Sequence, residues 1–266
     1  MEIDKAVVFA EREGYRALEL DLYRAAGRSA RPSPLLLYVH GGGWRMSHRS
    51  RAPRETRPWD RGFFERLTDA GFVVAASDYR LSGEATYPAQ LDDVVEAWRW
   101  LGSQSEALGV DGRRRYVWGA SAGGHLAALL ALRAGPSGPR AAVCWYPVTD
   151  ITRFDHDARD IYEAHLLGGQ VGERLQLARE ASPVAHVHAD APPVLLQHGD
   201  ADTWVPCEQS VMLAEALRAV GAPVELDIVP GADHFFGGSD AVEGIFDRAV
   251  EFLLAVDRDI QGQLSG

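Results

Sequence analysis

The stretch that decides the fold is Tyr116-Val117-Trp118-Gly119-Ala120-Ser121-Ala122-Gly123-Gly124-His125, in which a β-type run ends at Gly-x-Ser-x-Gly. A strongly helical run, Leu126-Ala127-Ala128-Leu129-Leu130-Ala131-Leu132, follows without a break. A strand-to-helix turn this sharp brings the backbone close to itself, so glycines are needed where a Cβ would clash. The same turn exposes the hydroxyl of Ser121 at the start of a helix. We interpret Ser121 as a nucleophile.

The composition describes an acidic chain that can bury a large core. Of the 266 residues, 46% are hydrophobic and 24% are charged, and the formal net charge is -11. This length and composition allow one α/β domain. Because an acidic chain is repelled by phosphates and anionic lipids, we expect neither nucleic acid nor a membrane as a partner.

The cysteines and the first residues bear on the cellular compartment. Cys144 lies in an apolar run and Cys207 lies beside a turn, so we predict free thiols and no metal-binding cysteine pair. The start, Met1-Glu2-Ile3-Asp4-Lys5, lacks the basic and apolar regions of a secretion signal, and no run reaches transmembrane length. We therefore expect a cytoplasmic protein.

Strand-like and helix-like runs alternate along most of the chain. Two runs within residues 4–23 suit an antiparallel pair with one solvated face. Buried strands are predicted at 35–39, 72–77, 116–118, 141–145, 194–198 and 224–229, and helices at 63–71, 88–101, 126–132, 208–220 and 241–256. This order predicts an α/β fold with a mostly parallel eight-stranded sheet and helices on both faces.

One segment, at about residues 148–190, departs from this alternation. It is long enough for a short helical flap but not for a lid domain, so we expect a small cap insertion within a single domain covering residues 1–266. Right-handed crossovers bring the carboxyl ends of parallel strands to one edge of the sheet. The loops that follow the strands should therefore meet near Ser121.

A serine hydroxyl needs a base and an orienting acid before it attacks at neutral pH. In hydrolases built around such a turn, the acid and then the base follow the serine along the chain. Asp200 and Asp202 follow one predicted strand, and His234, the only one of nine histidines beyond Asp202, follows the last. We predict His234 as the base and Asp202 as the acid. Asp200 stays open as the alternative acid, because spacing excludes neither aspartate.

The negative charge that develops on the attacked carbonyl needs backbone N–H groups in a loop without obstructing side chains. Gly41-Gly42-Gly43 follows a buried strand and suits this role, together with the amide of Ala122 at the positive end of the helix. We expect His40 to brace the glycine loop rather than to carry protons. This chemistry requires no cofactor or metal, and we predict none.

The ordered motifs resemble those of α/β-hydrolase esterases over nearly the whole chain. They are His40-Gly41-Gly42-Gly43-Trp44, Asp78-Tyr79-Arg80-Leu81, Gly119-Ala120-Ser121-Ala122-Gly123-Gly124-His125, Ala181-Ser182-Pro183, His198-Gly199-Asp200-Ala201-Asp202-Thr203-Trp204-Val205-Pro206 and Gly231-Ala232-Asp233-His234. They are most similar to BD-FAE and hormone-sensitive-lipase-like carboxylesterases, with kynurenine formamidases nearby. The resemblance implies the α/β-hydrolase fold, Asp202 as the acid, and Gly42, Gly43 and Ala122 as oxyanion donors.

The activity that this resemblance implies is that of a serine hydrolase that cleaves small carboxylic esters through an acyl-enzyme. Amidases or formamidases, thioesterases and acyltransferases use the same triad and remain alternatives. A non-catalytic ligand-binding protein on this fold is a more distant alternative.

Aromatic and basic residues bear on the substrate. Aromatic side chains flank the catalytic loops, and those that face the site should bind or confine the substrate: Trp44, Trp145, Tyr146, Trp204 and Phe235. The segment Arg45–Arg61 carries six arginines, which form either a solvated loop or, with His48, a site for an anionic group of the small-molecule ester. The sequence leaves both interpretations open, as it does the possibility of a homodimer.

Overall fold

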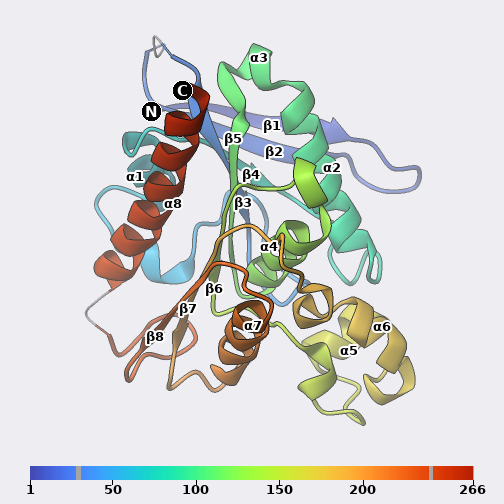
Figure 1. Ribbon diagram of the computed structural model, residues 1–266. Coiled ribbons are helices and arrows are strands. Elements are labelled where there is room, and N and C mark those ends of the chain that lie inside the picture. The colour runs from blue at the N-terminus through green and yellow to red at the C-terminus, as the bar shows by residue number, and fades with distance from the viewer. Residues whose placement is uncertain (28–30, 240–241, 266) are drawn as a thin grey trace.

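The computed structural model describes residues 1–27, 31–239 and 242–265, and its centre is an eight-stranded sheet (Figure 1). The strands lie side by side in the order β1-β2-β4-β3-β5-β6-β7-β8. Their bounds are β1 (Glu2–Ala10), β2 (Leu18–Arg24), β3 (Ser33–Val39), β4 (Val73–Ser77), β5 (Val110–Ala120), β6 (Ala142–Trp145), β7 (Val194–Gly199) and β8 (Val224–Val229). β1 and β2 pair antiparallel, β2 pairs antiparallel with β4, and the remaining neighbours run parallel. The predicted mostly parallel sheet is confirmed.

Helices cover both faces of this sheet. Their bounds are α1 (Phe63–Asp69), α2 (Ala89–Ser103), α3 (Ser105–Leu108), α4 (Ala122–Arg133), α5 (Tyr162–Leu167), α6 (Leu175–Glu180), α7 (Glu208–Ala219) and α8 (Val242–Ser265). In Figure 1, α1 and α8 lie on one side of the sheet, and α2, α4 and α7 lie on the other. The prediction of helices on both faces is therefore also confirmed.

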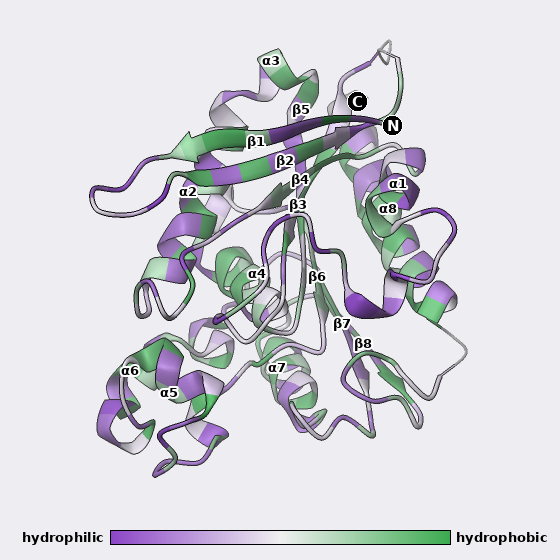
Figure 2. Cartoon of the chain, turned by 180° about the vertical axis from the view of Figure 1, so that it is seen from behind, coloured by the Kyte–Doolittle hydropathy of each residue, from purple (hydrophilic) through white to green (hydrophobic). Residues whose placement is uncertain are grey.

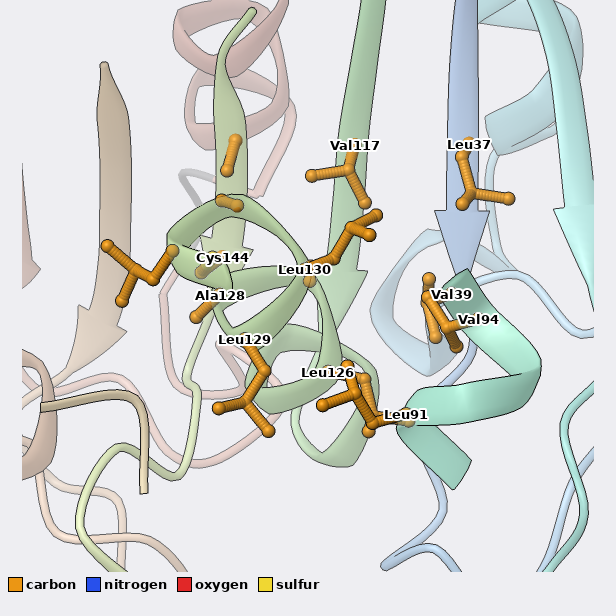
Figure 3. Packing of buried hydrophobic residues seen from close by; sticks show 14 of the residues in the cluster. Leu37, Val39, Leu91, Val94, Val117, Leu126, Ala128, Leu129, Leu130 and Cys144 are labelled. Carbon is orange, nitrogen blue, oxygen red and sulfur yellow. The ribbon is translucent and has the colours of Figure 1, made fainter. Parts of the chain in front are cut away.

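The apolar side chains of β3 divide between the two faces, as the twofold alternation of a strand requires. Leu35, Leu37 and Val39 belong to the hydrophobic cluster beneath α2 and α4, part of which Figure 3 shows from close by. Leu36 and Tyr38 belong to the cluster beneath α1 and α8. The run 35–39, which is apolar at every position, thus fills two cores.

Helix α4 is buried along almost its whole length, and it is mainly green, the colour of hydrophobic residues, in Figure 2. It packs against β5, β6 and β3 on the sheet and against α2 beside it. Because α4 follows Ser121 directly, this burial fixes the position of the nucleophile.

The cap insertion between β6 and β7 consists of short helices. They are the 3₁₀ turns Ile151–Arg153, Gly172–Arg174 and Pro183–His186 and the six-residue helices α5 and α6. In Figure 1 these helices lie together beside the lower end of α4. The predicted small helical insertion is confirmed.

Most predicted elements agree with the structure to within a few residues. The last helix is longer than expected, because it continues to Ser265; its predicted first residue, Ala241, lies outside the described residues. Both cysteines are free thiols, as predicted. Within the described part of the chain, no helix combines the length and the apolar character that a membrane crossing would need.

Candidate active site

Ser121 lies in the turn between β5 and α4, with a φ of 55° that is rare for a residue with a side chain. The turn depends on its two flanking glycines. A Cβ on Gly119 would lie 2.1 Å from the carbonyl oxygen of Gly123, and a Cβ on Gly123 would lie 2.0 Å from that of Val39. Neither position has room for any other residue, so the glycines hold the hydroxyl of Ser121 at the edge of the sheet.

The three residues predicted as a triad form one connected chain of contacts. His234 Nε2 lies 3.0 Å from Ser121 Oγ, and His234 Nδ1 lies 2.6 Å from Asp202 Oδ2. Because an ionised carboxylate can only accept, Nδ1 carries the proton and Nε2 is free to accept the proton of the serine hydroxyl. This arrangement is suited to activating Ser121 as a nucleophile.

Asp202 is buried and held by several donors. Its Oδ1 accepts the backbone N–H groups of Trp204 at 2.8 Å and Val205 at 2.9 Å, and His198 Nε2 lies 3.1 Å from Oδ2. Burial alone would raise the pKa of Asp202, but the hydrogen bonds from His198 and His234 outweigh it and hold this pKa well below its usual value. Asp202 is therefore a carboxylate at neutral pH.

Asp200 has a different place. Its side chain is exposed, and Oδ1 accepts the backbone N–H of Gly231 at 2.6 Å. It joins the two loops that carry Asp202 and His234. The structure thus brings Asp202, rather than Asp200, into contact with the imidazole.

The glycine loop follows β3 and lies beside Ser121. Gly42 and Gly43 both have positive φ, 115° and 59°, and line the same cavity as Ser121 and Ala122. A Cβ on Gly43 would lie 2.4 Å from the ring of Tyr162. A loop this tight presents backbone amides without side chains in front of them, as an oxyanion site requires.

Two buried histidines hold this loop in place. His40 stacks on Tyr79 with a centroid separation of 4.3 Å, and its Nδ1 donates to the carbonyl of Gly41 at 2.7 Å. Trp44 Nε1 donates to His125 Nδ1 at 3.1 Å, which ties the loop to α4. Burial lowers the pKa of His40 and that of His125 to about 4. Both rings are neutral at physiological pH, so His40 braces the loop as expected.

The catalytic groups open into a cavity of about 920 Å³. One part of its wall comes from the cap insertion and the segment that follows β6. The apolar residues of this wall are Val148, Phe154, Ile161 and Tyr162. Another part consists of Arg51, Arg54 and Arg57, together with Trp204 and Phe235 next to His234. The cavity therefore has an apolar wall and a basic wall.

Four of the five aromatic residues predicted to contact the substrate line this cavity. They are Trp44, Tyr146, Trp204 and Phe235. Trp204 is 59% exposed and stacks on His234 with an interplanar angle of 21°. The expectation that Trp145 contacts the substrate is wrong, because its side chain does not line the cavity. Trp145 ends β6 with its side chain fully buried in the core between the sheet and α8, where Nε1–H donates to Gln197 at 2.7 Å.

The six arginines of the segment 45–61 fall into two groups of three. Arg45, Arg49 and Arg61 form ion pairs with carboxylates, namely Asp160 for Arg45, Glu19, Asp21 and Asp78 for Arg49, and Glu65 and Asp69 for Arg61. Arg51, Arg54 and Arg57 line the cavity, and none of them forms an ion pair with a carboxylate among the residues that the structure describes. The segment is thus partly a structural network and partly cavity wall.

Three residues of the site were not predicted from the sequence. His198 precedes Asp202 in the motif His-Gly-x-x-Asp, and its position at the end of a buried strand was a usable signal. Glu55 accepts the hydroxyl of Tyr146 behind His234, and Glu163 lines the cavity from the cap. Neither glutamate belongs to a motif, so only the tertiary structure reveals them.

The family model described as BD-FAE matches residues 20–217. An ethyl acetate hydrolase from Pseudomonas putida is 32% identical over 269 residues, which cover 95% of this chain and 80% of the relative. Esterase LipQ from Mycobacterium tuberculosis is 31% identical over 242 residues, which cover 84% of this chain. The match spans only 55% of the length of LipQ.

Solved structures share the fold and the arrangement of elements. The butyrate-bound esterase Est2 from the planctomycete Thermogutta terrifontis superposes with a TM-score of 0.76 at 29% identity, covering 96% of this chain and 94% of that one. The eight-stranded sheet described above is thus the sheet of an α/β-hydrolase.

Proposed function

The chain belongs to the BD-FAE family, and we propose that it hydrolyses small carboxylic esters with Ser121 as nucleophile, His234 as base and Asp202 as orienting acid. The observation that carries this proposal is the connected chain of contacts from Ser121 Oγ through His234 to Asp202, of which Ser121 and His234 line the cavity. The relatives, whose names describe them as esterases, favour an ester over an amide substrate.

The first half-reaction forms an acyl-enzyme. His234 Nε2 takes the proton of Ser121 while Oγ forms a bond to the ester carbonyl carbon, and the carbonyl electron pair moves to the oxygen. The amides of Gly42, Gly43 and Ala122 stabilise this oxyanion, and Asp202 stabilises the protonated imidazole. When the intermediate collapses, the bond to the alcohol oxygen breaks and His234 gives its proton to that oxygen.

The second half-reaction consumes water. His234 takes a proton from water while the water oxygen attacks the acyl carbon. Collapse of this intermediate releases the carboxylic acid and returns the proton to Ser121 Oγ. The enzyme is then in its starting state, with one ester and one water converted to one acid and one alcohol.

We also propose that the substrate carries a negative charge. Arg51, Arg54 and Arg57 line the cavity without a carboxylate partner in the described part of the chain, and Arg54 lies over the ring of Phe235 beside His234. Exposed guanidinium groups favour an anion modestly and through a screened field. The ester 4-acetoxybenzoate should therefore be hydrolysed several-fold faster than the neutral 4-acetoxybenzamide, with a preference that weakens as salt is added. Arg57→Ala should reduce this preference and Arg61→Ala, which changes an arginine already paired with acids, should not.

Replacement of the nucleophile tests the proposed function. Ser121→Ala should abolish both the turnover of p-nitrophenyl acetate and labelling by a fluorophosphonate, since only an activated hydroxyl attacks phosphorus readily. Ser47→Ala is the matched control, because Ser47 lines the same cavity and should be dispensable. Labelling that survives in Ser121→Ala and moves to another serine would refute the proposal.

A further inference from the structure

Glu163 is a buried carboxylate that faces the catalytic cavity. It lies in the first turn of α5, only 6% of its surface is exposed, and it lines the cavity beside Ile161 and Tyr162. Among the described residues, no side chain forms a hydrogen bond or an ion pair with its carboxylate. A carboxylate in this setting is costly unless something else supplies a donor.

The free energy of ionisation reflects this cost. Burial raises the pKa of Glu163 to about 6, against the small opposing effect of its own amide. The arginines of the basic wall do not reach it, and Asp160 on the same segment pairs instead with Arg45 and His165. The cavity itself is therefore the place from which a donor could come.

The position of α5 relates Glu163 to one part of the ester. The leaving alcohol must lie beside His234, which protonates it, and the side chains around His234 are Tyr146, Trp204 and Phe235. Helix α5 instead packs on the glycine loop, where the ring of Tyr162 blocks any Cβ on Gly43. Glu163 follows Tyr162 in this helix, and none of the rings that contact His234 comes from α5, so we assign the part of the wall that includes Glu163 to the acyl group.

We propose that Glu163 accepts a hydrogen bond from a hydroxyl group on the acyl portion, so that the preferred substrates are esters of short hydroxy acids. This inference rests on the proposed function and names the substrate class of the same site. A hydroxyl fits better than an ammonium group, because Arg51, Arg54 and Arg57 make the cavity unfavourable to cations. A site built to hydrogen-bond a substrate hydroxyl discriminates strongly against the analogue without it.

The test compares p-nitrophenyl butyrate with the p-nitrophenyl esters of 2- and 3-hydroxybutyrate, each as separate enantiomers. We expect kcat/KM to be at least about tenfold higher for one of the hydroxy esters than for butyrate in the wild type. Glu163→Leu should invert this preference by lowering the rate on that hydroxy ester and raising the rate on butyrate. Glu163→Gln keeps an acceptor and should retain part of the preference.

Two controls separate binding from structure. Glu173→Leu changes an exposed cap carboxylate that pairs with Arg159, and it should leave the substrate ratio unchanged. Glu163→Leu should also raise Tm, because it removes a buried group without a partner, whereas a purely structural role at the start of α5 predicts a lower Tm. Equal rates on the hydroxy and plain esters in the wild type, or a ratio unchanged in Glu163→Leu, would overturn the inference while leaving ester hydrolysis intact. Failure to hydrolyse any of the esters would count against both proposals.

Discussion

His198 donates Nε2–H to Oδ2 of Asp202 across 3.1 Å, so the carboxylate oxygen that faces His234 is held from both sides. The same Nε2 lies 2.8 Å from the carbonyl oxygen of Val205. Because both contacts are with acceptors, the proton must reside on Nε2. Nδ1 lies 2.7 Å from Ser210 Oγ, which fixes the ring from its other end. His198 therefore positions Asp202 without touching the reacting atoms.

Replacing His198 should impair catalysis through Asp202. His198→Phe keeps a ring in the core but removes the donor, and a hydrogen bond to a charged group is worth a factor of about 10 to 100 in rate. Since the hydrogen bond from His198 helps to hold the pKa of Asp202 down, its loss raises that pKa. The more basic carboxylate then binds the Nδ1 proton of His234 more strongly and favours the imidazolium, which cannot act as the base. The acidic limb of the profile of kcat/KM against pH should move to higher pH.

Ser210→Ala is the control for this experiment, because it removes the partner of Nδ1 and leaves both contacts of Nε2 in place. It should leave the acidic limb where it is in the wild type. Full activity of a folded His198→Phe, with an unshifted acidic limb, would show that His198 only fills space.

Replacing each of the two aspartates of this loop, Asp200 and Asp202, should reduce kcat to very different extents. Asp202→Asn presents His234 with an amide and favours the wrong tautomer, and we expect kcat to fall by about 10⁴. Asp200→Asn affects an exposed contact with the N–H of Gly231 and should cost less than about tenfold. Circular dichroism first establishes that both variants are folded. Their steady-state kcat values then show which aspartate is the orienting acid. A larger loss in Asp200→Asn would contradict the assignment of the acid.

The sheet and the nucleophile turn could be predicted because local chemistry determines them. Gly119 and Gly123 stand where any Cβ would meet backbone within 2.1 Å, so the sequence pattern and the geometry carry the same information. The apolar runs 35–39 and 194–196 similarly favour buried strands, and their side chains divide between the two cores. Chain order then sufficed to predict His234, but it left Asp200 as an alternative to Asp202 until the structure placed Asp202 against the imidazole.

The cavity walls could not be predicted in this way. Trp145 and Tyr146 are neighbours in sequence, yet one enters the core and the other faces the cavity, because the backbone of Tyr146 turns to a φ of 36° at the end of β6. Glu163 lies in an insertion whose course depends on packing against the glycine loop. The division of the six arginines also depends on acids far away in sequence, such as Asp21 and Asp78.

Glu55 should make stability depend on pH. Its Oε1 accepts the hydroxyl of Tyr146, whereas its buried Oε2 has no partner, and burial raises the pKa from 4.5 to about 7. A carboxyl whose pKa is raised on folding favours the folded state below its unfolded pKa, and this stability is lost as pH rises through about 7. Glu55→Gln keeps the acceptor for Tyr146 and cannot ionise.

Urea unfolding of the wild type and Glu55→Gln at about pH 4 and about pH 8 measures this effect. The two proteins should be equally stable at the lower pH, and the variant should be more stable at the higher pH by on the order of 2–3 kcal/mol. Glu65→Gln, which alters an exposed carboxylate paired with Arg61, should show no comparable change with pH. A difference of the same size at both pH values would mean that Glu55 does not titrate in this range.

The value of kcat/KM should depend on the length of the acyl chain. Val148, Phe154, Ile161 and Tyr162 form the apolar wall of the cavity, to which we assign the acyl group, and the described part of the cap contains only short helices. Each CH₂ that fits gains up to about 0.8 kcal/mol, and each that does not fit must remain in water or displace the wall. We therefore expect kcat/KM to peak between about C2 and C4 in a p-nitrophenyl ester series and to fall steeply beyond about C6.

Enlarging the wall should move this maximum. Phe154→Ala removes a ring from the acyl side, so the optimum should shift toward longer chains, whereas Trp204→Ala changes the rim beside His234 and should leave the optimum unchanged. The series is measured up to about C16, below and above the critical micelle concentration of the long esters. Because the cap is too short to uncover a long apolar channel, no rate increase should accompany micelle formation. A wild-type maximum at about C10 or longer, or a jump in rate at the micelle threshold, would instead indicate a lipase-like acyl tunnel beneath a mobile lid.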